Sequence, residues 1–305
     1  MISFLLIISY IGIGLLLRQT RMMPENSPVV LNTYVLYVAL PALILKNVPL
    51  LHFSSALLIP TVTPWILLIA VVLIILMLAR LFKWSREVTG AMLIILPLGN
   101  TSFLGYPMTQ ALFGEQGMPY AVIYDQLGSF IALTTYATVV AAIYSAQVAK
   151  PDLRKIVLKI ITFPSFIALI VGLLFRDAVW PEFVHALIDG LSATLVPVVM
   201  IAVGYQLHFR FNRSELGPMI SALGIKLMLM PLIAWSIWKI MGEQGLVVDI
   251  SIFQAAMPPM ISAGALAIMA GLAPRLVSGI IGFGILLSLV TLPAVYWLLS
   301  MPQSI

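Results

Sequence analysis

The sequence predicts an all-α integral membrane protein with ten transmembrane helices. Apolar residues make up 62% of the 305 residues and charged residues only 9%, whereas soluble proteins carry about 25% charged residues. Apolar runs of about 20 residues, long enough to cross a bilayer as a helix, recur with short polar gaps. The predicted spans are 2–18, 29–47, 64–82, 88–113, 118–147, 156–175, 184–208, 217–238, 248–271 and 276–299.

Basic residues gather in alternate loops of this ten-span arrangement. Only Lys46, Arg176 and Lys239 lie in the loops after the even-numbered spans. The loops after the odd-numbered spans contain Arg18, Arg21, Arg80, Lys83, Arg86, Lys150, Arg154, Lys155, Lys159, Arg210, Arg213 and Arg275. By the positive-inside rule, this second set faces the cytoplasm and both termini lie outside. The net charge of +5 therefore reflects membrane topology, and we expect no nucleic-acid partner.

Two halves of five spans each flank the basic segment "KPDLRK", which predicts a duplicated unit at 1–149 and 150–305. An odd number of spans per unit forces the two copies into opposite orientations. Spans four and nine occupy equivalent places, and both contain helix-breaking residues, in "LPLGNTSFLGYPMTQALF" and "FQAAMPPMISAGALAIMAG". Paired interrupted helices in inverted repeats indicate a transport site at the membrane midplane. The alternative is a pair of simple proline kinks, which neighbouring helices can repair.

The breaks have a polarity that favours an anion. Proline is common in the first turn of a helix, so Pro107 and Pro259 are expected to open the second half-helices of spans four and nine. A helix N-terminus carries a partial positive charge and unpaired N–H groups. If spans four and nine cross at their breaks, two such ends meet in one place.

Polar and helix-breaking residues at these breaks form the predicted binding site. Asn100 and Thr101 in span four and Ser262 in span nine can offer hydrogen bonds to a ligand, or can instead satisfy backbone groups freed by the breaks. The remaining candidates in the breaks are Gly105, Pro107, Pro258 and Pro259.

Lys226 is the only charged residue near the middle of a predicted span, and Asp125 is the only carboxylate well inside one, since Asp189 and Asp249 lie near span ends. Lys226 is roughly 14–18 Å from either end of its helix. Burying a charge at that depth of a membrane is costly, so Lys226 is a candidate for a functional residue. It either attracts a substrate carboxylate or serves as a fixed counter-charge for the negative ends of the first half-helices. Asp125, in "YDQLGSF", is the candidate for carrying a coupled proton; the alternative is a solvated aspartate near the membrane surface.

Several motifs resemble the auxin efflux carrier superfamily, which includes plant PIN-formed auxin exporters and bacterial carriers proposed to move malonate and related acids. "NTSFLGYP", from Asn100 to Pro107, is similar to the family signature Asn-Thr-x-x-Met/Leu-Gly-x-Pro. "LNTYVLYVALPALI", "KLMLMP" and "AAMPPMISAG" resemble its second, eighth and ninth spans. The resemblance implies a five-plus-five inverted repeat with crossing helices, related to sodium/proton antiporters and bile acid symporters. It also implies elevator-like alternating access, a homodimer and, for the compact branch, the bacterial inner membrane.

The sequence excludes the common enzyme classes and resident cofactors. It lacks HExxH, GxSxG and phosphate-binding loop motifs, it has no cysteine, and its three histidines lack metal-ligand spacing. We therefore predict no cofactor and no metal. Together with the paired helix breaks and the family resemblance, this predicts a secondary transporter in the lipid bilayer for a small organic anion, a carboxylate. The alternatives are a sodium-coupled symporter of the bile-acid type, an anion channel and a substrate sensor.

Overall fold

The computed structural model describes residues 2–51, 54–145, 152–207 and 215–301. Most of these residues form helices, and no strand is present among them. Three of the basic residues used for the topology, Lys150, Arg210 and Arg213, lie outside the described residues. The fold class is therefore the predicted one, all-α with long apolar helices.

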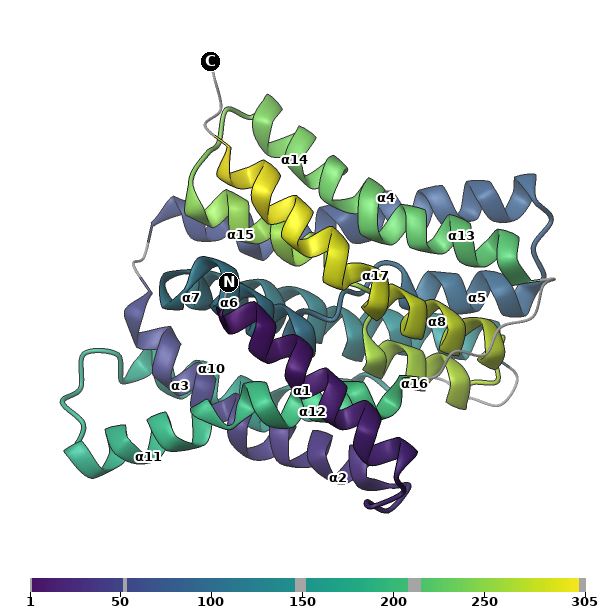
Figure 1. Ribbon diagram of the computed structural model, residues 1–305. Coiled ribbons are helices and arrows are strands. Elements are labelled where there is room, and N and C mark those ends of the chain that lie inside the picture. The colour runs from purple at the N-terminus through teal and green to yellow at the C-terminus, as the bar shows by residue number, and fades with distance from the viewer. Residues whose placement is uncertain (1, 52–53, 146–151, 208–214, 302–305) are drawn as a thin grey trace.

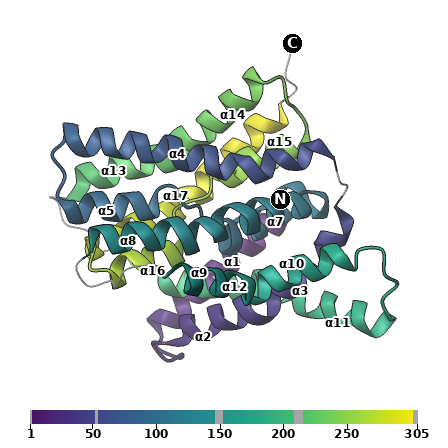
Figure 2. The same ribbon diagram turned by 180° about the vertical axis from the view of Figure 1, so that it is seen from behind.

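The helices form two groups, one below the other in Figure 1 and again in the reverse view of Figure 2. In the lower group, α1 packs against α12, and α3 packs against both α10 and α11. The lower group consists of α1 (Ile2–Gln19), α2 (Ser27–Tyr34), α3 (Leu40–Asn47), α9 (Leu153–Ile161), α10 (Pro164–Leu174), α11 (Glu182–Ala193) and α12 (Leu195–Gln206).

The upper group holds both interrupted segments, α5 with α6 and α15 with α16. Its helices are α4 (Leu58–Leu81), α5 (Arg86–Ile95), α6 (Tyr106–Phe113), α7 (Met118–Tyr124), α8 (Thr138–Tyr144), α13 (Leu216–Gly224), α14 (Met230–Ile240), α15 (Leu246–Ala255), α16 (Ile261–Met269) and α17 (Pro274–Ser300). Figure 1 shows α6 and α7 at its lower edge, where they meet the lower group.

Seven continuous helical segments of the described chain are long and apolar enough to cross a membrane. An eighth candidate is the pair α9 and α10, which is bent by 56°. This pair covers the predicted span 156–175, and its bend is a feature that the sequence analysis did not predict. The bend occurs because Phe163 precedes Pro164, and a residue before proline avoids the helical conformation; Phe163 is extended, with φ −73° and ψ 126°. The other two predicted spans are the interrupted segments.

Observed and predicted bounds otherwise agree within a few residues, except that α4 begins at Leu58, six residues before the predicted start at 64. Pro64 lies inside that helix and does not begin it.

Three helices contain a π-helical turn that ends two residues before a proline. The turns are η1 (Val35–Ala39), η4 (Thr101–Gly105) and η9 (Ile225–Leu229), and the prolines are Pro41, Pro107 and Pro231. Proline lacks an N–H group and its ring collides with the carbonyl four residues earlier. A π turn bonds five residues back and widens the helix at that point, so each helix passes its proline without ending. Two further π turns, η6 (Asp125–Phe130) and η7 (Leu133–Ala137), join α7 to α8.

Two glycines bring α1 and α12 into close contact. A methyl group on Gly14 would overlap the carbonyl oxygen of Ile201, and one on Gly204 would overlap the carbonyl oxygen of Ile11. The two helices therefore meet backbone to backbone, which fixes their spacing.

Candidate functional site

The two helix interruptions lie against each other and satisfy each other's backbone. The N–H of Asn100 donates to the carbonyl of Pro258 at 2.7 Å, and the N–H of Met260 donates to the carbonyl of Leu98 at 3.0 Å. Gly99 and Pro259 face each other as an antiparallel bridge between these bonds. Unpaired backbone groups are costly inside a membrane, so each break supplies the partners that the other requires.

The second half-helices begin at this bridge, but not at the predicted prolines. The first resumes at Thr101, as the π turn η4 that runs into α6, and the second at Ile261. Pro107 lies a full turn inside the first of them, where η4 accommodates its missing N–H, and Pro259 lies within the second break. The prediction that Pro259 opens a half-helix is therefore wrong, whereas Pro107 does lie in the first turn of α6, with the π turn η4 added before it.

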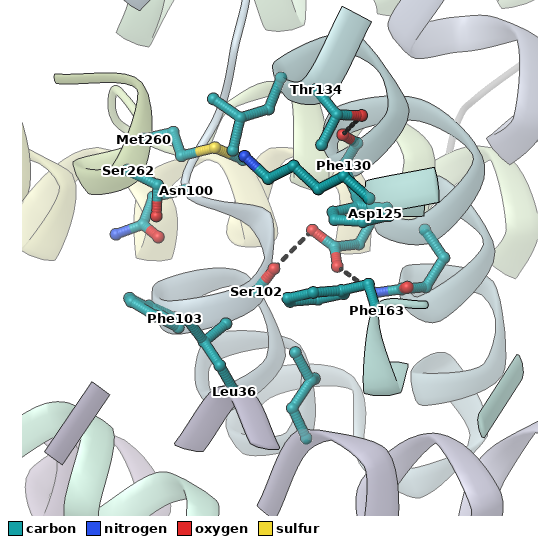
Figure 3. Close-up of a pocket in the computed structure, with 14 residues that line it drawn as sticks. Leu36, Asn100, Ser102, Phe103, Asp125, Phe130, Thr134, Phe163, Met260 and Ser262 are labelled. Carbon is teal, nitrogen blue, oxygen red and sulfur yellow. Dashed lines mark hydrogen bonds between the residues drawn. The ribbon is translucent and has the colours of Figure 1, made fainter. Parts of the chain in front are cut away.

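A cavity of about 220 Å³ lies beside the paired breaks, between the two groups of helices. Figure 3 shows Asn100, Met260 and Ser262 on one side of it, with Asp125 and Ser102 facing them. Aromatic rings of Phe103, Phe130 and Phe163 form much of the remaining wall. The polar lining residues are Asn100, Ser102, Asp125, Gln126, Thr134, Lys159 and Ser262.

Asp125 is buried, with 1% of its surface exposed, so the alternative of a solvated aspartate is wrong. Its Oδ1 accepts hydrogen bonds from the hydroxyls of Thr101 and Ser102, the latter at 2.7 Å. Its Oδ2 accepts from the Tyr106 hydroxyl and from Gln126 Nε2, each at 2.8 Å. Three of these donors belong to the start of the half-helix that follows the first break, so Asp125 connects span five to that break.

Two polar atoms at the cavity are buried without a partner. They are the amide nitrogen Nδ2 of Asn100 and the amide oxygen Oε1 of Gln126. Both residues line the cavity, and buried polar groups are normally hydrogen-bonded. The residues that line the cavity therefore include one unused hydrogen-bond donor and one unused acceptor.

Lys226 is buried, with 1% exposed, in the π turn η9. A methyl group on Gly99 would lie 3.4 Å from Lys226 Nζ and 3.5 Å from the carbonyl oxygen of Gln254. The ammonium group thus lies close to where α5 and α15 end, and its nitrogen is 3.2 Å from the sulfur of Met230. Lys226 is not among the residues that line the cavity.

The other predicted residues divide into those at the cavity and those behind it. Asn100 and Ser262 line it, whereas Thr101 lies behind it and holds Asp125. Gly105 faces the Gln254 side chain, whose amide oxygen a methyl group at position 105 would overlap. Pro258 contributes its carbonyl oxygen to the bridge.

Sequence reasoning missed several residues of the cavity. Ser102 and Gln126 adjoin predicted residues, and their polarity inside apolar spans was the available signal. From the sequence, Lys159 is assigned only to the basic residues that set the membrane topology, because the sequence does not show that its helix bends toward the cavity. Phe163 carries no signal that separates it from a lipid-facing aromatic residue.

Comparison with known proteins places this chain in a family. The family described as "Membrane transport protein" matches residues 1–296, and it is the auxin efflux carrier family. The chain belongs to this family. The resemblance seen in the sequence motifs is therefore confirmed, and the protein is a multi-pass membrane transporter and not an enzyme.

Two archaeal relatives extend over most of the chain. An uncharacterized transporter of Methanothermobacter thermautotrophicus is 29% identical over 291 residues, which cover 92% of each chain. An uncharacterized transporter of Methanocaldococcus jannaschii is 26% identical over 263 residues, which cover 83% of this chain and 84% of the relative. Both names describe transport and neither names a substrate.

Proposed function

We propose that this auxin efflux carrier family member is a secondary transporter that binds a small organic anion, a carboxylate, in the cavity at the paired breaks. The observation that carries this proposal is that both second half-helices start at one cavity. Asn100 and Ser102 come from the start of the first, and Met260 and Ser262 from the start of the second. The first N–H groups of a helix lack intrahelical partners and carry partial positive charge, which suits a carboxylate.

Side chains of the cavity complete this site. The unpartnered Asn100 Nδ2 offers a hydrogen bond to a carboxylate oxygen, and the Gln126 Oε1 accepts one from a hydroxyl or amide elsewhere on the substrate. Lys159 supplies a positive charge in the lining. The many aromatic and aliphatic wall residues leave room for an apolar substrate body.

Lys226 has a different proposed role. Its location near the ends of α5 and α15 supports the counter-charge interpretation, because the C-terminal end of a helix carries partial negative charge. We therefore assign Lys226 to stabilisation of the paired breaks and Lys159 to attraction of the anion. Thr101, Gly105, Pro107, Pro258 and Pro259 shape the same breaks without contacting the substrate through their side chains.

Asp125 is the proposed coupling residue. A charged carboxylate and an anionic substrate repel each other inside a membrane, where a neutral Asp125 removes that repulsion. This arrangement supports binding of the anion together with one proton. Sodium coupling is the competing possibility, since the Asp125 carboxylate and the Gln126 amide oxygen are also suitable cation ligands.

Alternating access in the manner of an elevator is supported by the division into two groups of helices. The lower group would remain fixed while the upper group carries the site across. The proposed inverted repeat of 1–149 and 150–305 relates the packing of α1 on α12 to that of α10 on α3, since the first and sixth spans exchange roles. By charge distribution and family resemblance, we place both termini outside the plasma membrane and expect a homodimer.

Purified protein in liposomes tests this function. Counterflow should be saturable for one or more carboxylates, be absent for their methyl esters, and be driven by an imposed pH gradient in sodium-free buffer. A requirement for sodium would replace proton coupling. Unsaturable flux at channel rates, or no carboxylate binding in a thermal-shift screen, would contradict the proposal.

A further inference from the structure

One lysine joins three helical segments at one end of the molecule. Lys46 lies in the last turn of α3. Its Nζ is 3.0 Å from Oδ1 of Asp189 in α11 and 3.5 Å from Oε1 of Glu115. Glu115 begins the short 3-10 turn Glu115–Gly117, which connects α6 to α7.

The two partners of Lys46 belong to different groups of helices. Asp189 is in the lower group with Lys46, and α3 packs against α11. Glu115 is in the upper group, at the connection that leaves the half-helix α6. The ion pair with Asp189 is therefore internal to one group, whereas the pair with Glu115 crosses between the two groups.

In the ten-span topology predicted from the sequence, Lys46 and the accessible end of the cavity lie on opposite sides of the membrane. Lys46 ends the second span and Lys159 begins the sixth, so spans three to five, an odd number, separate them. Lys159 lines the cavity and is exposed. Toward Lys46, the fully buried side chains of Ile44, Tyr106 and Met108 belong to one packed cluster. A separate cavity of about 80 Å³ at Lys46 and Glu115 shares no lining residue with the larger one. The structure is therefore open on the Lys159 side and closed on the Lys46 side.

We propose that Lys46 is a positioning residue that holds the cavity closed on its own side of the membrane through Glu115, while Asp189 keeps the lysine in place. In the alternate state the Glu115 contact separates and the Asp189 contact persists. This inference rests on the alternating access proposed above, but it does not depend on the substrate.

The strength of the contact fits a gate that must open in every cycle. The side chain of Lys46 is 33% exposed and that of Glu115 is 67% exposed. Ion pairs between such exposed groups shift an equilibrium by only a few-fold. Removing the lysine charge should therefore increase the open population on this side about two- to fivefold.

Cross-linking provides the first test. Because the chain contains no cysteine, the two engineered thiols are the only ones that can react. Lys46→Cys is combined with Glu115→Cys in one variant and with Asp189→Cys in a matched control, and both are treated after reconstitution with a short, reducible bis-thiol reagent. We expect the first cross-link to stop counterflow until a reductant is added, and the second to leave it unchanged. Full counterflow with the first pair cross-linked would overturn the proposal.

Cavity accessibility provides a second test that needs no substrate. Thr134→Cys, which lines the cavity, is labelled by a membrane-impermeant maleimide from either side. Lys46→Gln should raise labelling from the Lys46 side about two- to fivefold, the exchange pair Lys46→Glu with Glu115→Lys should restore the original rate, and Lys239→Gln on the same side should have no effect. Equal labelling with and without Lys46→Gln would refute the latch. A labelling change without transport of any carboxylate would instead retain the latch and reject the proposed substrate.

Discussion

The main-chain N–H of Asn100 donates to the carbonyl oxygen of Pro258 at 2.7 Å, so two segments far apart in the sequence meet in mid-molecule. With the reciprocal bond from Met260 to Leu98, this contact closes both interruptions. Neither interrupted segment could be accommodated in lipid without the other, because each would expose unpaired backbone groups. The proposed substrate site and the stability of the upper group therefore depend on the same few residues.

Asn100→Ala should weaken carboxylate binding about five- to tenfold, the usual effect of losing one hydrogen bond. Thermal stability should change little, because the Nδ2 atom that is removed has no partner in the protein. Binding is measured by calorimetry on the purified protein. Asn32→Ala, which also removes a side chain with an unpartnered amide atom but lies away from the cavity, is the control. Unchanged affinity in Asn100→Ala would show that the cavity is not the binding site.

Lys159→Gln should lower anion affinity, whereas Lys226→Met should lower stability. The first removes a cation from the cavity lining and should lower anion affinity about two- to fivefold, more at low salt than at high salt, without affecting stability. The second should leave affinity nearly unchanged and reduce stability by about 2 kcal/mol, because it removes the counter-charge at two helix ends. Parallel measurements of affinity and unfolding temperature separate the two roles. Loss of binding in a stable Lys226→Met protein would restore the direct substrate role.

Asp125→Asn should remove the pH dependence of binding. The proposed coupling requires Asp125 to be neutral when the anion binds, so the affinity of the wild type should fall as the pH rises and the carboxylate loses its proton. Asparagine is neutral at every pH, so the affinity of the variant should stay level. Asp249→Asn changes another carboxylate within the helices, in α15, and should retain the wild-type profile. A pH profile in Asp125→Asn that matches the wild type would exclude Asp125 as the coupling residue.

Gly204→Ala should lower the unfolding temperature far more than Gly190→Ala. The methyl group at 204 meets the main-chain carbonyl of Ile11, which cannot move aside without separating α1 from α12. A cost of about 1–3 kcal/mol is typical of such overpacking. Position 190, inside α11, has open space around it, and alanine there should stabilise the helix slightly. Similar unfolding temperatures for the two variants in detergent would mean that α1 and α12 are not tightly packed.

Much of the fold could be predicted because lipid restricts what a sequence can do. A continuous apolar run leaves few options other than a helix, so the long helices were found with small errors at their ends. The breaks near Asn100 and Pro258 were also visible, since several helix-breaking residues cluster in otherwise apolar spans. The exact start of each half-helix was not, because a proline such as Pro107 suits both a first turn and the turn after a π bulge.

The site was predicted less completely because its lining depends on packing between distant segments. Asn100 and Ser262 were identified from their own spans. Lys159 joins them only because the chain bends before Pro164, and a single proline gives no information about the direction of a bend. The depth of Lys226 in its helix predicts a cation near the site. Depth along a helix does not show which neighbouring segment the side chain faces.

The proline-linked π turns have a consequence for how this architecture tolerates change. Each holds one residue more than an ordinary turn would, so it acts as a built-in insertion that rotates the preceding segment by about 100° relative to the following one. In η4 that rotation sets where Thr101 and Ser102 point relative to α6. Deleting a single residue there, together with replacing Pro107, would give a regular α-helix in which the hydroxyls of Thr101 and Ser102 point in other directions. Irregular geometry is thus part of how the chain orients its polar groups.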